Sequence, residues 1–174
     1  GLYVSTIVNA SLLVMLCIGF TFTYMMEKFP NFAHTSFASI GTMVSYFLVR
    51  FHGWNPYHTW PLTMLISGLV GVALYLGLVK HIQKRMFTEI TLTFTFYIIS
   101  QLIVQSIAMF SYWILMGTGV PSSGFTVFNY DFRWKGIQVI GIVAPITVIT
   151  IVILLWGFLT KSKHGIAMRA TAED

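Results

Sequence analysis

The chain has 174 residues, of which 56% are hydrophobic and 9% are charged, and its mean hydropathy is +0.79. This composition excludes an ordinary soluble domain and indicates an integral membrane protein. The formal net charge of +5 does not point to nucleic acid, because no basic stripe with interleaved aromatic residues accompanies it. The single cysteine, Cys17, excludes a disulfide framework or a CxxC metal site within the chain.

Apolar runs predict the fold. A helix needs about 20 apolar residues to cross a hydrocarbon core of about 30 Å. We expect five membrane segments, at residues 2–26, 35–49, 61–79, 88–116 and 136–159. Strict alternation of polar and apolar residues occurs only at residues 89–96, whereas a membrane β-barrel needs it in every strand. The predicted fold class is therefore all-α, a polytopic transmembrane helical bundle.

The extent of the chain also supports an expectation. It starts without a methionine, inside apolar sequence, and it stops where a new element is predicted to begin. We expect residues 1–174 to form a single transmembrane domain that is incomplete at its C-terminus.

The second predicted segment, residues 35–49, is short and rich in small polar residues such as Thr35, Ser36 and Ser39. Pro30 precedes it. A short segment of this kind next to a proline is typical of a discontinuous or re-entrant element that lines a substrate pathway. The alternative is that the small residues only let helices approach closely.

Two glutamines in the fourth segment, Gln101 and Gln105, lie one helical turn apart and share a face. They could contact a polar substrate or form hydrogen bonds between helices. His34 has no neighbouring ligand in sequence, so a structural role is favoured over metal binding. The sequence has no Gly-rich phosphate loop, no paired intramembrane carboxylates and no H-E-x-x-H motif. We therefore expect no catalytic residue, metal or cofactor.

Basic residues predict the orientation in the membrane. If the link after the third segment is cytoplasmic, seven of the ten Lys and Arg residues lie inside, as the positive-inside tendency requires. The N-terminus is then outside and the tail, residues 161–174, is cytoplasmic. The tail ends in Ala-Glu-Asp, which suits the first turn of a helix because acidic groups favour a helix N-terminus. Such a helix is predicted to be an interface, and the alternative is a solvated basic tail.

Three motifs resemble those of branched-chain amino acid ABC-transporter permeases. The tail GIAMRATAED (residues 165–174) is similar to the G-x-A-x-R-A-x-A-E-D segment that opens their cytoplasmic coupling region. NFAH (residues 31–34) resembles their NFAHG motif, and TEITLTFTFYIISQ (residues 88–101) resembles their apolar stretch ending in Leu-Gln. The chain departs from the family at Thr35, where a glycine is usual, and in KHIQKR (residues 80–85), where an acidic residue and Arg-Pro are usual.

The resemblance implies a permease subunit of an ABC importer in a prokaryotic cell membrane, not an enzyme. Its substrates would be branched-chain amino acids or related small polar solutes such as amides or urea. Its implied partners are ATP-binding cassette ATPase subunits, a second permease that is identical or paralogous, an extracytoplasmic solute-binding protein and the lipid bilayer. A passive channel and a structural membrane subunit are the alternatives.

The resemblance and the residue patterns together give the expected site residues. The expected substrate pathway comprises Asn31, Phe32, Ala33, His34, Ser36, Ser39, Gln101 and Gln105. The expected ATPase-coupling residues are Gly165, Arg169, Ala170, Ala172, Glu173 and Asp174.

Overall fold

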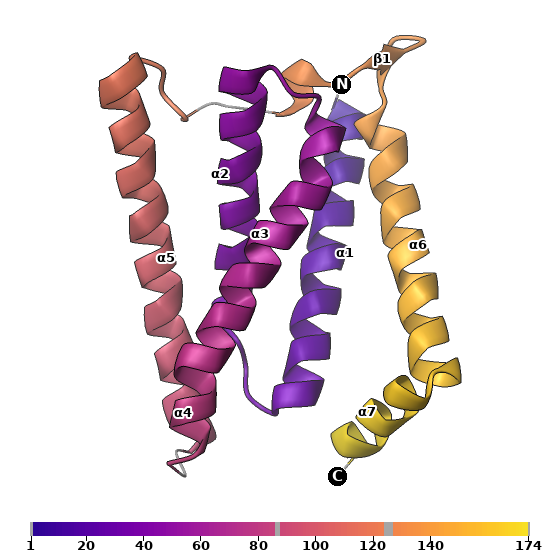
Figure 1. Ribbon diagram of the computed structural model, residues 1–174. Coiled ribbons are helices and arrows are strands. Elements are labelled where there is room, and N and C mark those ends of the chain that lie inside the picture. The colour runs from indigo at the N-terminus through magenta and orange to yellow at the C-terminus, as the bar shows by residue number, and fades with distance from the viewer. Residues whose placement is uncertain (1, 86–87, 124–126, 174) are drawn as a thin grey trace. The chain divides into compact units, whose positions relative to one another are not determined.

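The computed structural model describes residues 2–85, 88–123 and 127–173, and these are mainly helical (Figure 1). The α-helices are α1 Leu2–Glu27, α2 His34–His52, α3 Thr59–Leu74, α4 Lys80–Gln83, α5 Glu89–Thr118, α6 Ile140–Lys161 and α7 Lys163–Glu173. Shorter elements are the 3₁₀ turns Pro56–His58 and Val127–Tyr130, a π-helical segment Tyr75–Val79 between α3 and α4, and a hairpin of β1 Arg133–Trp134 and β2 Ile137–Gln138. The predicted all-α membrane fold is confirmed.

Within the described parts of the chain, four helical stretches are long and apolar enough to cross a membrane: Leu2–Glu27, Pro56–Gln83, Glu89–Thr118 and Ile140–Lys161. They correspond to the first, third, fourth and fifth predicted segments. The second segment forms α2, which is not among the four, because His34, Arg50 and His52 at its ends and its hydroxyl-bearing residues lower its hydropathy. The chain is a multi-pass membrane protein.

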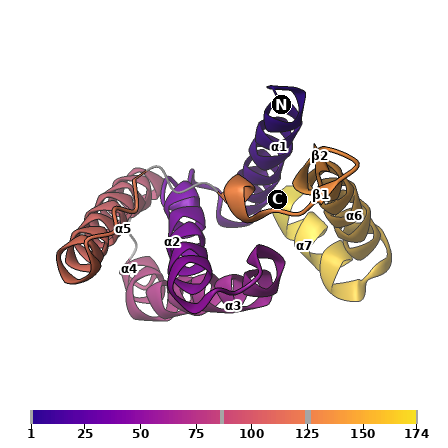
Figure 2. The same ribbon diagram turned by 90° about the horizontal axis from the view of Figure 1, so that it is seen from above.

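Contacts divide the chain into two compact units, one of Gly1–Pro30 with Asp131–Asp174 and one of Asn31–Tyr130. In the second unit, α2 lies between α3 and α5 and packs against both (Figure 2). Hydroxyl pairs mark both contacts. Ser45 and Thr59 join α2 to the start of α3 with their oxygens 2.9 Å apart, and Ser36 joins α2 to Ser100 of α5.

Helix α2 is longer than predicted and unbroken. It has 19 residues and continues past Val49 to His52, because the polar residues after Val49 do not themselves interrupt a helix. Gly53 stops it with a left-handed backbone, φ 64°, which glycine adopts without steric cost. The predicted interruption is confined to the link before α2.

The third segment also differs from its prediction at its end. The helical path continues without a break from α3 through the π-helical segment Tyr75–Val79 into α4, which ends at Gln83. In a π-helix each turn closes one residue later than in an α-helix. The predicted end at Val79 is therefore four residues too early.

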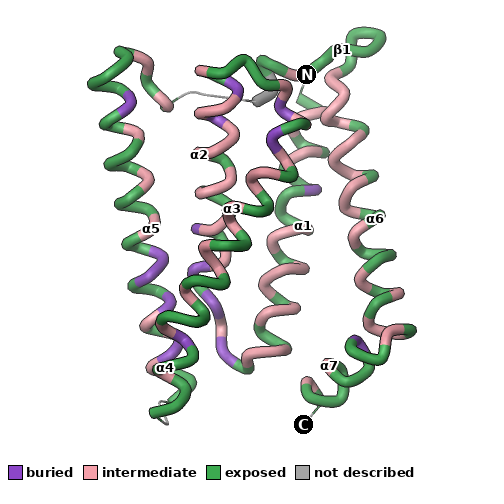
Figure 3. The backbone as a smooth tube through the Cα atoms, viewed as in Figure 1, coloured by how far each residue is buried: buried purple, intermediate pink, exposed green. Residues whose placement is uncertain are grey.

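The buried residues of the second unit belong mainly to α2 and α5 (Figure 3). They include Tyr46 and Val49 on α2 and Leu92, Phe96 and Ile99 on α5. Helix α5 begins where the side chain of Thr88 accepts a hydrogen bond from the backbone of Thr91. Most of the outward surface is apolar, as expected for helices that face lipid or other membrane subunits.

In the first unit, α1 packs against α6, and α7 contacts both. The predicted start of the fifth helix at residue 136 is wrong, because Lys135 and Gly136 turn the chain with φ of 49° and 83° to form the hairpin. Helix α6 begins at Ile140. The carboxylate of Asp131 accepts a hydrogen bond from the backbone N–H of Ile140 at 2.8 Å, so Asp131 stabilises this helix start.

Candidate functional site

The link before α2 folds into a turn built by Asn31. The side-chain oxygen of Asn31 accepts a hydrogen bond from the backbone N–H of Ala33 at 3.0 Å, and its carbonyl accepts one from His34 at 3.2 Å. Asn31 is buried and Ala33 is fully buried, whereas Phe32 is half exposed. Asn31 therefore satisfies backbone donors that the start of α2 leaves open.

Ser36 is a contact between helices. It is 3% exposed, and its Oγ lies 2.7 Å from Oγ of Ser100 on α5. Each hydroxyl is the buried partner of the other. Of the two serines predicted to line a pathway, Ser36 is closed off by this contact.

Ser39, one turn further along α2, lies on open space between α2 and α5. We call this space the hydroxyl groove; it has a volume of about 440 Å³. Its lining residues are Ser39, Thr42, Met43, Tyr46, Val104, Ile107, Ala108, Ser111 and Ser122. The groove contains no charged side chain among these residues.

The hydroxyls of this groove have defined hydrogen-bond partners. Ser39 donates to the carbonyl of Thr35 at 3.4 Å, and Thr42 donates to the carbonyl of Ala38 at 3.1 Å. Ser111 on α5 and Ser122 in the following link are bonded to each other. The groove therefore offers fixed oxygen atoms beside apolar walls.

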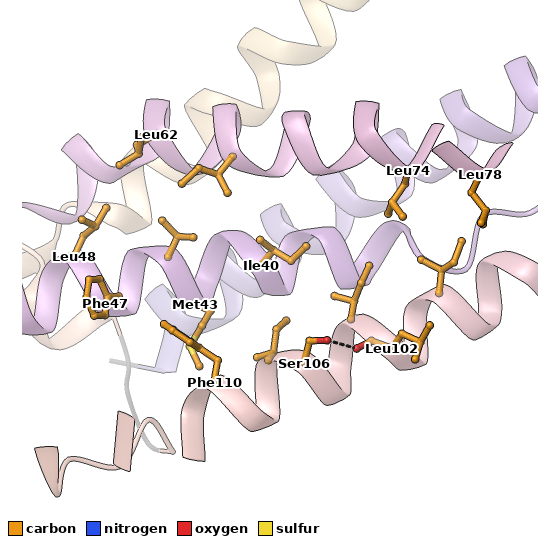
Figure 4. Close-up of a pocket in the computed structure, with 15 residues that line it drawn as sticks. Ile40, Met43, Phe47, Leu48, Leu62, Leu74, Leu78, Leu102, Ser106 and Phe110 are labelled. Carbon is orange, nitrogen blue, oxygen red and sulfur yellow. Dashed lines mark hydrogen bonds between the residues drawn. The ribbon is translucent and has the colours of Figure 1, made fainter. Parts of the chain in front are cut away.

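A second and larger space, which we call the apolar groove, lies among α2, α3 and α5 (Figure 4). Its volume is about 680 Å³. Aliphatic and aromatic side chains line it, among them Ile40, Phe47, Leu102 and Phe110, and the one hydroxyl, Ser106, donates to the carbonyl of Leu102 at 2.8 Å. This groove suits aliphatic chains rather than a polar solute.

Gln101 and Gln105 line neither of these two grooves. Both are exposed on α5, one turn apart, and their side chains make no hydrogen bond with another described residue. The structure thus brings Ser39 to the hydroxyl groove but does not bring the two glutamines there.

A sharp corner joins α6 to α7. Ser162 has an extended backbone, φ −84° and ψ 138°, so it ends α6, and its carbonyl accepts the first bond of α7 from Ile166 at 2.9 Å. Gly165 is buried against the end of α6, where an added Cβ would lie 2.1 Å from the carbonyl oxygen of Phe158. Only glycine allows this approach.

The other predicted coupling residues lie along α7. Arg169, Ala170 and Glu173 are exposed, and Ala172 is half-buried. The prediction that Ala-Glu-Asp opens a helix is wrong: α7 already begins at Lys163, because the extended Ser162 starts it, and Glu173 lies in its last turn. Asp174 lies outside the described residues.

Some residues near these sites carried no signal in the sequence. Lys28, after the end of α1, has φ 62° and donates a hydrogen bond from Nζ to the carbonyl of Ala172. Ser111 and Ser122 are isolated hydroxyl residues, whereas Thr42 belongs to the small polar residues of the second predicted segment but was not among the expected site residues. Their meeting depends on how α2 packs against α5.

These features define a class: a multi-pass membrane protein with polar and apolar grooves between its helices and a short helix fixed at the end of a membrane helix. The family model described as the permease component of branched-chain amino acid transport systems matches residues 2–174. The chain belongs to the branched-chain amino acid transport permease family.

A curated relative agrees with this assignment. The chain is 33% identical over 168 residues to a protein of Methanocaldococcus jannaschii named "Probable branched-chain amino acid transport permease protein LivH". The alignment covers 97% of this chain and 53% of that protein, so the chain spans about half the length of this relative. No solved structure matches the chain.

Proposed function

We propose that the chain serves as a permease subunit of an ABC importer for branched-chain amino acids or related small polar solutes. The observation that carries this proposal is the α6–α7 corner, where Gly165 packs a short helix directly onto the end of a membrane helix. A displacement of a helix held in this way is passed on to the membrane helix α6, whereas a displacement of a flexible tail is not. The family and the named relative support the same function.

The coupling surface in this proposal is α7. Arg169, Ala170 and Glu173 are exposed for contact with an ATPase subunit. We assign Asp174, which lies outside the described residues, to the same contact from the sequence alone. Ala172 carries the bond from Lys28, so movement of α7 is passed to α1 as well as to α6. ATP binding biases a two-state bundle at this end, and a loaded solute-binding protein biases it at the other. Hydrolysis takes place in the separate ATPase.

The substrate pathway in this proposal runs along α2. Asn31, Phe32, Ala33 and His34 shape its cytoplasmic end, Ser39 lines it, and the contact of Ser36 with Ser100 fixes its wall. Gln101 and Gln105 serve instead as hydrogen-bond partners of another membrane subunit, such as the second permease.

The basic residues support the orientation in the cell membrane. Lys80, Lys84 and Arg85 follow the third segment and lie on the cytoplasmic side in this proposal, with the N-terminus outside. The solute-binding protein then delivers substrate at the face opposite α7.

Affinity purification from native membranes in mild detergent tests the importer function. We expect a Walker-motif ATPase to co-purify with the wild-type chain and to be lost from the double variant Glu173→Lys, Asp174→Lys. The exposed Lys80→Glu, in another predicted cytoplasmic segment, is the control and should keep the ATPase. Recovery of only integral membrane subunits, with no nucleotide-binding protein, would contradict the proposal and favour a structural subunit.

A further inference from the structure

The hydroxyl groove differs in chemistry from the apolar groove although the two share a wall. Met43 and Ile107 line both spaces. Five hydroxyl-bearing residues line the hydroxyl groove, Ser39, Thr42, Tyr46, Ser111 and Ser122, against Ser106 in the apolar groove, and the lining of the hydroxyl groove includes no acid and no base. A site without a charged side chain disfavours a ligand with net charge, because that charge would have no counter-ion in a low-dielectric surrounding.

The pair Ser111 and Ser122 presents a hydrogen-bond donor. Each hydroxyl has one hydrogen, and the bond between the two oxygens uses one of them. The hydrogen of the accepting hydroxyl remains available to a ligand. A carboxylate, which only accepts hydrogen bonds when ionised, is the best partner for such a donor.

Ser39 and Thr42 present acceptors. Both hydroxyl hydrogens are donated to backbone carbonyls one turn earlier on α2. Only their oxygen lone pairs remain for a ligand, and an ammonium group, which is a donor without lone pairs, is the matching partner.

The donor end of the groove, at Ser111 and Ser122, and its acceptor end, at Ser39 and Thr42, are separated along the helices. Helices α2 and α5 run side by side in the same direction, because Ser36 meets Ser100 and, further along both helices, the ring of Phe47 lies 6.3 Å from that of Phe110. With this register, Ser39 and Ser111 are about 12 Å apart along the helices at 1.5 Å per residue. One small zwitterion therefore meets the donor end and the acceptor end one after the other.

Aliphatic side chains fill the space between the two ends. Met43 of α2 and Val104 and Ile107 of α5 lie there. Such side chains bind a branched alkyl group, and the flexible thioether of methionine adapts to its shape.

We propose that the hydroxyl groove binds a zwitterionic amino acid with an aliphatic side chain, its carboxylate on the Ser111–Ser122 pair and its alkyl group on Met43 and Ile107. Ser39 and Thr42 then receive the ammonium group as the solute moves along α2. This inference rests on the proposed importer function and assigns the solute a place in the permease.

Protection of an introduced cysteine tests the groove directly. In a Cys17→Ser background, Ala108→Cys places a thiol in the hydroxyl groove, and Ser106→Cys places one in the apolar groove on the same helix. We expect L-leucine to slow maleimide labelling at position 108 and not at position 106. Leucinol, which lacks the carboxylate, should protect at least tenfold more weakly.

Variants of the donor pair sharpen this test. Ser111→Ala or Ser122→Ala should raise the leucine concentration needed for protection by about tenfold or more, because a hydrogen bond to a charged group is lost. Equal protection of both thiols, or equal protection by leucine and leucinol, would overturn the assignment of the groove.

ATP-driven leucine uptake by the assembled permease and ATPase, measured in parallel, separates the two proposals. Uptake without protection at position 108 would overturn the assignment of the amino acid site to the hydroxyl groove, while the importer function would be supported. Protection without uptake supports the groove as an amino acid site and contradicts the importer function.

Discussion

The hydroxyls of Ser36 and Ser100 join the first turn of α2 to the middle part of α5. The two oxygens are 2.7 Å apart and buried. In an apolar surrounding, a buried hydroxyl that loses its partner costs about 1–3 kcal/mol, whereas replacing both partners together costs less. The pair therefore acts as a unit.

We expect Ser36→Ala and Ser100→Ala each to lower the free energy of unfolding by about 1–2 kcal/mol. The double variant should lose less than the sum of the two, with a coupling energy of about 0.5 kcal/mol or more. Thermal unfolding in detergent measures the stability of the two single variants and of the double variant. Thr93→Ala is the control, because this α5 hydroxyl donates to the carbonyl of Glu89 on its own helix and has no partner on another described helix. Strictly additive losses would contradict the pairing.

At this scale the sequence identified the kind of residue but not its environment. Ser36 and Ser39 differ by three positions on one helix, and both were predicted to line a pathway. Ser36 faces a serine of α5, while Ser39 faces open space. Which residue of α5 opposes each one depends on helix packing, and neither periodicity nor composition specifies that packing.

The corner between α6 and α7 is the element whose geometry is most demanding. Ser162 bends the chain, and Gly165 lets the first turn of α7 touch the backbone of Phe158. The two helices are held at a set angle because there is no room for a side chain between them.

Gly165→Ala should open this corner, because the added Cβ would lie 2.1 Å from the carbonyl oxygen of Phe158. We expect the free energy of unfolding to fall by about 1–3 kcal/mol, and the angle between α6 and α7 to vary more widely. Spin labels on cysteines introduced at Ile153 and Thr171, in a Cys17→Ser background, measure the distance between α6 and α7. A wider range of angles between the helices appears as a broader distribution of this distance.

Gly157→Ala is the matched control, since its Cβ would meet nothing within 4 Å. It should leave the distances between the labels unchanged. An equally narrow distribution in the Gly165→Ala protein would show that the corner does not depend on glycine.

The sequence predicted the membrane helices well and their ends less well. Long apolar runs identified four spans, because hydrophobic thickness imposes their length. The errors at residue 136 and in the tail have local causes. A left-handed turn at Lys135 and Gly136 and an extended Ser162 decide where α6 and α7 begin, and hydropathy contains no information on either.

For the whole molecule, the surface of α5 is the most informative. Gln101 and Gln105 are exposed among large apolar residues such as Ile98, Leu102 and Met109. Amide groups in hydrocarbon are costly without hydrogen-bond partners, so another helix is expected to cover this face in the assembled transporter.

The double variant Gln101→Leu, Gln105→Leu should leave the stability of the isolated chain nearly unchanged, because neither side chain bonds to a described residue. Its association with the second permease should weaken by roughly 0.6 kcal/mol for each hydrogen bond lost. Energy transfer between labelled subunits in nanodiscs measures this change. Ser106→Ala, in the apolar groove of the same helix, should leave association unaffected. Unaltered association of the double variant would place these glutamines outside the interface.

The π-helical segment Tyr75–Val79 has a consequence for protein evolution. Its wide turn accommodates one extra residue, whereas one residue added to or removed from a regular α-helix turns everything beyond it by about 100°. Deleting a single position within the segment would therefore restore an α-helical turn and keep Lys80, Lys84 and Arg85 on the same side of the helix, whereas the same deletion in α3 would rotate them. A one-residue gap in a homologue at this place is thus compatible with a basic cluster that faces the same neighbour.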